Sequence, residues 1–220
     1  MKIGKLTVRA GFILLVTTLV YLDQGGLLWV VFAAALLHEL GHYIPLRLLG
    51  GRVSRIELTG GGMGMEAAAP LSYRREIISV LGGPAASLVF ALLFSLRDGM
   101  IEGQAAIAGM CFSHALFNML PMRGLDGGRA LELILTACGV ERGRTVVHIT
   151  TAVTALALGL LCGILAVRHK NISLLLAMIY VFTSACRRRA AGGEPYEPLP
   201  KNRTVFNRRQ KTGPLHRRRG

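Results

Sequence analysis

The sequence predicts an all-α polytopic membrane protein with about six transmembrane helices. Of its 220 residues, 52% are hydrophobic and only 17% are charged, whereas soluble domains carry about 25% charged residues. The mean hydropathy is +0.47. Apolar runs near the length of a membrane helix recur along the chain, at 10–22, 27–46, 77–96, 104–122, 146–167 and 171–186. This composition excludes an ordinary soluble enzyme.

The first apolar run, 10–22, is short for a membrane span and follows Lys2, Lys5 and Arg9. A basic segment before a short apolar core is also typical of a signal peptide, but no small-residue cleavage site follows in "VYLDQGG". Snorkelling of flanking side chains or local thinning of the bilayer accommodates a short span. We therefore expect an uncleaved N-terminal transmembrane helix within residues 1–26.

The second run, 27–46, contains the polar segment "HELGH". Charged groups cost about 2.5–3.5 kcal/mol each at the centre of a membrane helix, so such groups need a function or a partner. His38 and His42 are four residues apart, which places them about 40° apart on one helix face, where both imidazoles can bind one ion. Glu39 is placed to reach a water molecule bound to that ion. H-E-x-x-H on a helix is typical of zinc metallopeptidases; the alternative is a buried polar network without metal.

A catalytic zinc ion needs a third protein ligand and one open position. The segment "NMLPMRGLDGG", residues 118–128, supplies Asp126 at the end of the fourth apolar run. Pro121 and the glycines around Asp126 break the helix there, and irregular backbone at membrane depth is tolerated only where it is buried in protein or lines a cavity. Taken alone, Asp126 fits the N-cap of a following helix equally well.

The connection after the HELGH helix contains "IELTGGGMGMEA", residues 56–67. Its glycines and alternating residues favour a short strand-like or re-entrant segment that pairs with an extended substrate, with Gly61 and Gly62 as substrate-binding residues. The alternative is a flexible connector. In the third run, Gly82 and Gly83 favour close helix packing.

The basic residues predict the topology. With both termini in the cytosol, 23 of the 26 Lys and Arg residues lie on the cytosolic side, as the positive-inside rule requires. The second and fourth runs then cross in the same direction, and both halves of the predicted site lie toward the cytosolic face. Residues 187–220 hold 11 of these basic residues. We expect a disordered tail there that contacts anionic lipid, and no nucleic-acid partner.

These segments divide the chain into four parts: an N-terminal transmembrane helix (1–26), a catalytic membrane core (27–145), two C-terminal transmembrane helices (146–186) and the basic cytoplasmic tail (187–220).

The combination of HELGH at 38–42 with N-x-x-P-x-x-x-x-D-G-G at 118–128 resembles the site-2 protease family of intramembrane zinc metalloproteases. The small-residue stretch "LGGPAASL", 81–88, is similar to that family as well. The chain is most similar to the stage IV sporulation protein FB branch, which processes a membrane-tethered pro-sigma factor in endospore-forming bacteria. Members of that branch often carry a C-terminal nucleotide-binding CBS domain, which this sequence does not show.

The resemblance implies a protease of the bacterial cell membrane with one catalytic Zn²⁺ held by His38, His42 and Asp126. Glu39 would be the general acid and base, and Asn118 would orient the substrate or stabilise the tetrahedral intermediate. The expected substrates are membrane-tethered proteins cut near the cytosolic face, such as a pro-sigma or anti-sigma factor, and a regulatory membrane partner stays open. Two alternatives remain: an ion or proton transporter that uses intramembrane His and Asp, and an inactive scaffold of the protease fold.

Overall fold

The computed structural model describes residues 2–3, 6–23, 25–59, 62–69, 71–96 and 102–169. Its elements, in chain order, are β1 (Lys2–Ile3), β2 (Leu6–Val8), α1 (Ala10–Leu22), α2 (Leu27–Leu48), β3 (Val53–Thr59), β4 (Gly62–Ala67), α3 (Tyr73–Ser95), α4 (Glu102–Asn118), α5 (Asp126–Ala137) and α6 (Gly143–His169).

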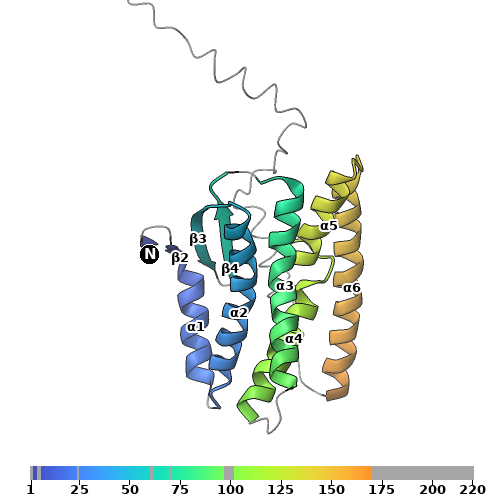
Figure 1. Cartoon of the computed structure of the whole chain (residues 1–220). Coiled ribbons are helices and arrows are strands. Elements are labelled where there is room, and N and C mark those ends of the chain that lie inside the picture. The colour runs from blue at the N-terminus through green and yellow to red at the C-terminus, as the bar shows by residue number, and fades with distance from the viewer. Residues whose placement is uncertain are drawn as a thin grey trace, which may run out of the picture.

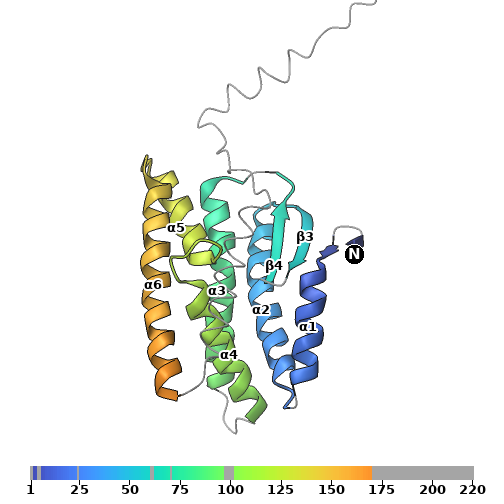
Figure 2. The ribbon, with the colours of Figure 1, turned by 180° about the vertical axis from the view of Figure 1, so that it is seen from behind.

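The helices form a bundle with roughly aligned axes, and the strands lie at one end of it (Figure 1). Helix α3 is central, because it contacts α2, α4 and α5. Seen from either side, α1 lies outside α2, and α6 lies on the far side of α5 (Figure 2). Helices α2 and α4 run in the same direction, opposite to α3, as the sequence predicted for the second and fourth apolar runs (Figure 1).

Five of the six predicted apolar segments are helices, and the sixth, 171–186, lies outside the described residues. Among the described helices, α2, α3 and α6 are long and apolar enough to cross a membrane, whereas α1 and α4 have only 13 and 17 residues. Large apolar side chains on their outer faces, such as Trp29 and Val167, are about four-fifths exposed. Many large apolar side chains are exposed on these helices, which suits a lipid environment. The chain is a multi-pass membrane protein.

Close packing of α2 on α3 follows from glycines on both helices. Pro45 has no N–H to donate to the Gly41 carbonyl four residues earlier, and the Gly82 backbone approaches that carbonyl instead. A Cβ added to Gly41 would lie 2.5 Å from both the Gly82 oxygen and the Ala86 Cβ. The close helix packing that the sequence predicted for Gly82 is therefore confirmed, and it fixes the height of the HELGH segment against α3.

The predicted break after the fourth apolar run is present. Helix α4 ends at Asn118, and α5 begins at Asp126 after a non-helical segment in which Gly124 has a left-handed φ of 91°. The first turn of α5 packs on this segment: a Cβ on Gly127 would lie 2.7 Å from the Leu120 carbonyl oxygen and closer still to that of Met119. The capping position is Leu125, so Asp126 is the first helical residue and not the N-cap.

The fold differs from the all-α prediction in having a four-stranded sheet of order β1-β2-β3-β4. The strands β3 and β4 form an antiparallel hairpin in which Gly62 pairs with Thr59, which confirms the strand-like character predicted for 56–67. Gly61 lies outside the described residues. The N-terminal β2 pairs in parallel with β3, with Leu6 opposite Ile56. Thr7 and Val8 are β-branched and suit a strand, but three residues are too few to predict one. The strand β2 forms by pairing with a segment about 50 residues away.

Candidate metal centre

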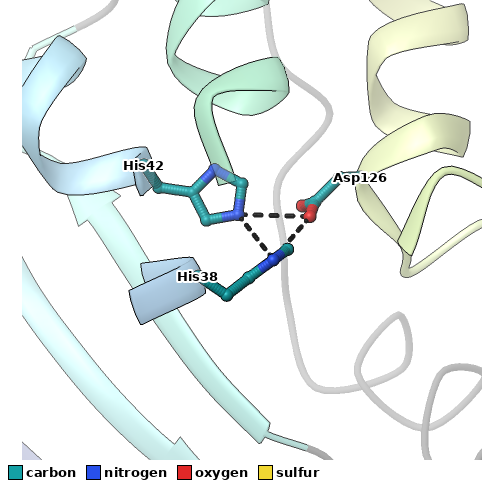
Figure 3. Close-up of side chains that lie close together, drawn as sticks. All are labelled: His38, His42 and Asp126. Carbon is teal, nitrogen blue, oxygen red and sulfur yellow. Dashed lines mark hydrogen bonds and ion pairs between the residues drawn. The ribbon is translucent and has the colours of Figure 1, made fainter. Parts of the chain in front are cut away.

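Three side chains predicted as ligands meet at one point between α2 and α5 (Figure 3). The Nε2 atoms of His38 and His42 lie 3.0 and 3.1 Å from Oδ2 of Asp126, and 3.1 Å from each other. The two imidazole planes are inclined at 84° and present their Nε2 atoms to the same point. His38 is almost completely buried, and Asp126 is about one-fifth exposed.

This triangle fits a tetrahedral zinc ion. Zinc binds imidazole nitrogen at about 2.0–2.1 Å and carboxylate oxygen at about 2.0–2.2 Å, so the ligand atoms of a tetrahedral site are roughly 3.3 Å apart. The three observed separations are within about 0.3 Å of that value. Two imidazoles and one carboxylate are also a donor set that suits zinc, and they leave the fourth position open.

A backbone hydrogen bond prepares His42 as a metal ligand. The Nδ1 atom of His42 lies 2.9 Å from the backbone carbonyl of Ser79, which can only accept, so Nδ1 carries a proton. In neutral His42 the lone pair of Nε2 then points at His38 Nε2 and at the Asp126 carboxylate. That lone pair is available to a cation placed between the three side chains. In the absence of a cation, Nε2–H of His38 can donate to the Asp126 carboxylate, because Nδ1 of His38 faces a hydroxyl that is able to donate to it.

Helix α3 orients both imidazoles through their Nδ1 atoms, on the opposite side of each ring from the metal-binding Nε2 atom. The Ser87 hydroxyl, which is completely buried, lies 2.9 Å from Nδ1 of His38. The Ser79 hydroxyl donates to the His42 backbone carbonyl at 3.1 Å. Gly83 lies directly under the His42 ring, where it has no side chain to displace it. Partners of this kind fix the tautomer and the ring orientation of metal-binding histidines.

Sequence reasoning did not identify Ser79 and Ser87 as part of the site. The signal was present, because Ser79, Gly83 and Ser87 recur at intervals of four in an apolar span and therefore share one helix face. A stripe of small and polar residues inside a membrane helix marks a face that contacts protein rather than lipid.

The Asp126 carboxylate is ionised at neutral pH. It lies outside the three candidate spans, at the start of α5. Burial raises the pKa of Asp126, but the hydrogen bonds and charges of His38 and His42 outweigh burial and lower this pKa to about 2. The carboxylate is therefore in the form that a metal ligand requires.

The remaining predicted residues lie around this centre or beside it. Glu39 is half-buried on α2 next to His38, close enough to interact electrostatically with His42. Asn118 is the last residue of α4, and its Nδ2 donates to the His114 carbonyl at 3.0 Å. The His114 ring lies 4.9 Å from the His38 ring. The roles of Glu39, Asn118 and Gly62 in catalysis or substrate binding stay predictions.

Comparison with known proteins finds similarity to zinc metalloproteases. No protein-family model matches the chain. It is 33% identical over 129 residues to a candidate zinc metalloprotease from Synechocystis sp., which covers 51% of this chain and 34% of the relative. It is 25% identical over 189 residues to a zinc metalloprotease from Methanocaldococcus jannaschii, which covers 79% of this chain and 54% of the relative. The chain thus spans about a third and about half of the length of these two curated relatives.

The structural comparison covers nearly the whole chain. The solved site-2 protease from Methanocaldococcus jannaschii superposes with a TM-score of 0.63 at 22% sequence identity, over 91% of this chain and 98% of that one. The chain therefore has the site-2 protease fold, with two histidines and an aspartate gathered in it as a candidate metal centre.

Proposed function

We propose that this protein is an intramembrane zinc metalloprotease that hydrolyses peptide bonds of membrane-tethered proteins. The observation that carries the proposal is the triangle of His38, His42 and Asp126, whose edges fit a tetrahedral zinc ion. Glu39 follows the first of these ligands, in the position of the general base of H-E-x-x-H enzymes. The similarity to zinc metalloproteases supports this assignment.

The chemistry divides between the ion and the chain. A bound zinc ion supplies a Lewis acid and brings the pKa of a coordinated water to about 7. Glu39 takes the proton of the attacking water and later donates it to the leaving amine. His38 and Ser87 are buried away from bulk water, and Asp126 is the most exposed of the three ligands, so water would reach the site beside its carboxylate.

Substrate binding requires an extended chain, because the amides of a transmembrane helix are hydrogen-bonded within the helix and shielded by side chains. Strand β4 is the last strand of the sheet, so one of its edges has no partner among the described strands. A locally unwound substrate would add to this edge by backbone hydrogen bonds, beginning near Gly61 and Gly62. Asn118 would contact the substrate near the scissile bond.

The charge distribution supports a cytosolic location for the sheet, the start of α3 and the end of α5, and for both termini. Cys138 tests this orientation, because it is exposed at the end of α5, whereas Cys111 and Cys162 are buried. The fourth cysteine, Cys186, lies outside the described residues and is first replaced by serine. In this background a membrane-impermeant maleimide should label Cys138 in inside-out vesicles and not in intact cells, and adding Cys138→Ser should remove that labelling. Labelling in intact cells would reverse the orientation.

Residues 187–220 lie outside the described residues, and we propose that they bind anionic lipid. Their 11 basic residues would each contribute about 1 kcal/mol near a negatively charged surface. Binding of a peptide of this segment to vesicles should require phosphatidylglycerol and weaken with salt. A pro-sigma or anti-sigma factor would suit the site as a membrane-tethered substrate.

Reconstitution tests the proposed function directly. The protein is placed in vesicles with a single-span substrate whose helix contains glycine and proline, and products are followed by mass spectrometry and zinc by elemental analysis. Wild type should cleave, and Glu39→Gln should bind zinc without cleaving. Glu141→Gln, at an exposed position between α5 and α6, is the matched control and should cleave normally.

Each other result argues against the proposal. Cleavage by Glu39→Gln at the wild-type rate would remove Glu39 from the mechanism. Zinc-loaded wild type that cleaves no membrane-tethered substrate would favour an inactive scaffold. Zinc-dependent flux of ions or protons without proteolysis would favour a transporter.

A further inference from the structure

An ion pair between an exposed arginine and a buried carboxylate joins α5 to α3 one turn away from the metal ligands. The Arg129 guanidinium donates to Oε1 of Glu76 at 2.6 Å. The Glu76 side chain is 9% exposed, whereas that of Arg129 is 59% exposed. The second carboxylate oxygen of Glu76 is buried and has no partner among the described residues. Arg129 is thus the ion-pair partner that the structure shows for a buried charge.

Arg129 is at an unfavourable place for a cation. It lies in the first turn of α5, where the helix dipole disfavours positive charge, while Glu76 lies in the first turn of α3, where negative charge is favoured. An apolar cluster of Val80, Ala130 and Leu133 already holds the two helices together beside the pair. Docking of α5 on α3 therefore does not by itself explain an arginine at this position.

The spacing to the metal ligand suggests what the pair does. Arg129 follows Asp126 by three residues on the same helix, and side chains three apart are neighbours that form ion pairs readily. Among the described ion pairs, Arg129 bonds to Glu76 and Asp126 bonds to the two histidines. An arginine released from Glu76 would have two carboxylates of α5 within reach, Asp126 three residues before it and Glu132 three residues after it. Asp126 is the less exposed of the two, at 21% against 37%, so its charge is less screened by water.

We propose that Glu76 is a positioning residue for the metal centre: it holds the Arg129 guanidinium on α3 and so leaves the Asp126 carboxylate free to bind the metal. This inference rests on the proposed function only in taking the triangle as a metal site. Without the Glu76 carboxylate, the Arg129 guanidinium is free to pair with Asp126 and so competes with zinc for it. Loss of Arg129 removes the competitor.

A purely structural pair makes the opposite prediction. Removing Arg129 leaves a buried, uncompensated carboxylate, whereas removing the Glu76 charge leaves an exposed guanidinium in water. If the pair only docked α5, Arg129→Gln would harm both thermal stability and zinc affinity more than Glu76→Gln. Under the proposal the two properties separate: Arg129→Gln is the less stable variant, and Glu76→Gln is the weaker zinc binder.

The experiment measures zinc affinity of the purified full chain by chelator competition, together with its thermal unfolding, without any substrate. Glu76→Gln should weaken zinc binding about tenfold or more, the lower end of the usual effect of residues behind metal ligands. Adding Arg129→Gln to it should restore affinity to within about threefold of wild type. Glu132→Gln is the matched control, because it removes a carboxylate of α5 that pairs with Arg144 of α6 and not with Arg129, and it should leave zinc affinity unchanged.

The outcomes are distinct from those of the protease test. If the double variant binds zinc as weakly as Glu76→Gln, or if Glu76→Gln binds as tightly as wild type, the proposal is wrong. If wild type itself binds no zinc, the proposed function fails first. Should Glu76→Gln not give monodisperse protein, Glu76→Asp replaces it: its shorter side chain cannot keep the 2.6 Å contact, and the same rescue by Arg129→Gln is required.

Discussion

Replacing Gly83 by alanine should destroy the metal centre without touching a ligand. A Cβ at this position would lie 2.7 Å from Cδ2 of the His42 ring and closer still to Nε2 and Cε1. Carbon atoms in ordinary contact are about 3.5–4.0 Å apart, so the ring or the helix must retreat by about 1 Å. The His42 ring cannot simply tilt away, because its Nδ1 is held by the Ser79 carbonyl at 2.9 Å.

That displacement is large on the scale of a zinc site. Ligand distances there are held to about ±0.2 Å, so a shift of about 1 Å removes His42 Nε2 from coordination. We expect zinc affinity to fall about 100-fold or more, at or beyond the upper end of effects from residues behind the ligands. Overpacking should also lower the free energy of unfolding by about 1–3 kcal/mol.

The assay is chelator competition for zinc in detergent, with thermal unfolding of the same samples. Gly109→Ala on α4 is the matched control, because a Cβ there meets nothing within 4 Å and a helical glycine-to-alanine change is neutral or mildly stabilising. Zinc affinity of Gly83→Ala within threefold of wild type would refute the reasoning, because the His42 ring would then not depend on the space above Gly83.

Three further predictions concern the same centre. Ser87→Ala removes the hydroxyl at Nδ1 of His38 and should weaken zinc binding about tenfold in chelator titrations. Ser79→Ala keeps the backbone carbonyl that binds His42 and should weaken zinc binding less. Equal effects of the two variants would contradict the assigned contacts. Asp126→Asn should reduce the bound zinc found by elemental analysis and abolish cleavage. A chelator should reversibly abolish cleavage by wild type. Full zinc occupancy of Asp126→Asn would exclude Asp126 as a ligand. Gly128→Ala places a Cβ 3.0 Å from the Arg123 nitrogen and closer to the Met122 carbonyl, so both zinc affinity and melting temperature should fall; an unchanged melting temperature would show that the first turn of α5 is not closely packed.

Much of the centre follows from local sequence. The spacing of His38 and His42 on one helix fixes their common face whatever the helix packs against. Pro121 and Gly124 lie in the non-helical segment between α4 and α5, as the sequence predicted, because proline lacks an N–H and Gly124 adopts a left-handed φ. The glycines after Asp126 do not break the backbone as expected, because they form the first turn of α5 and allow it to pack closely. The glycine-rich segment 56–67 was expected to be strand-like on the same local grounds, and β3 and β4 confirm it. The N-terminal strands β1 and β2, which precede the first predicted helix, were not anticipated.

The rest depends on contacts between segments far apart in the chain. That Ser79 and Ser87 face the histidines, that Gly83 lies under His42, and that Arg129 reaches Glu76 across 53 residues are all consequences of how α3 lies between α2 and α5. The sequence by itself determined which side chains can bind the metal, because ligand chemistry and helical spacing are local properties. Only the tertiary structure decided what holds those ligands in place, because the rotation of one helix against another depends on the shapes of both faces at once.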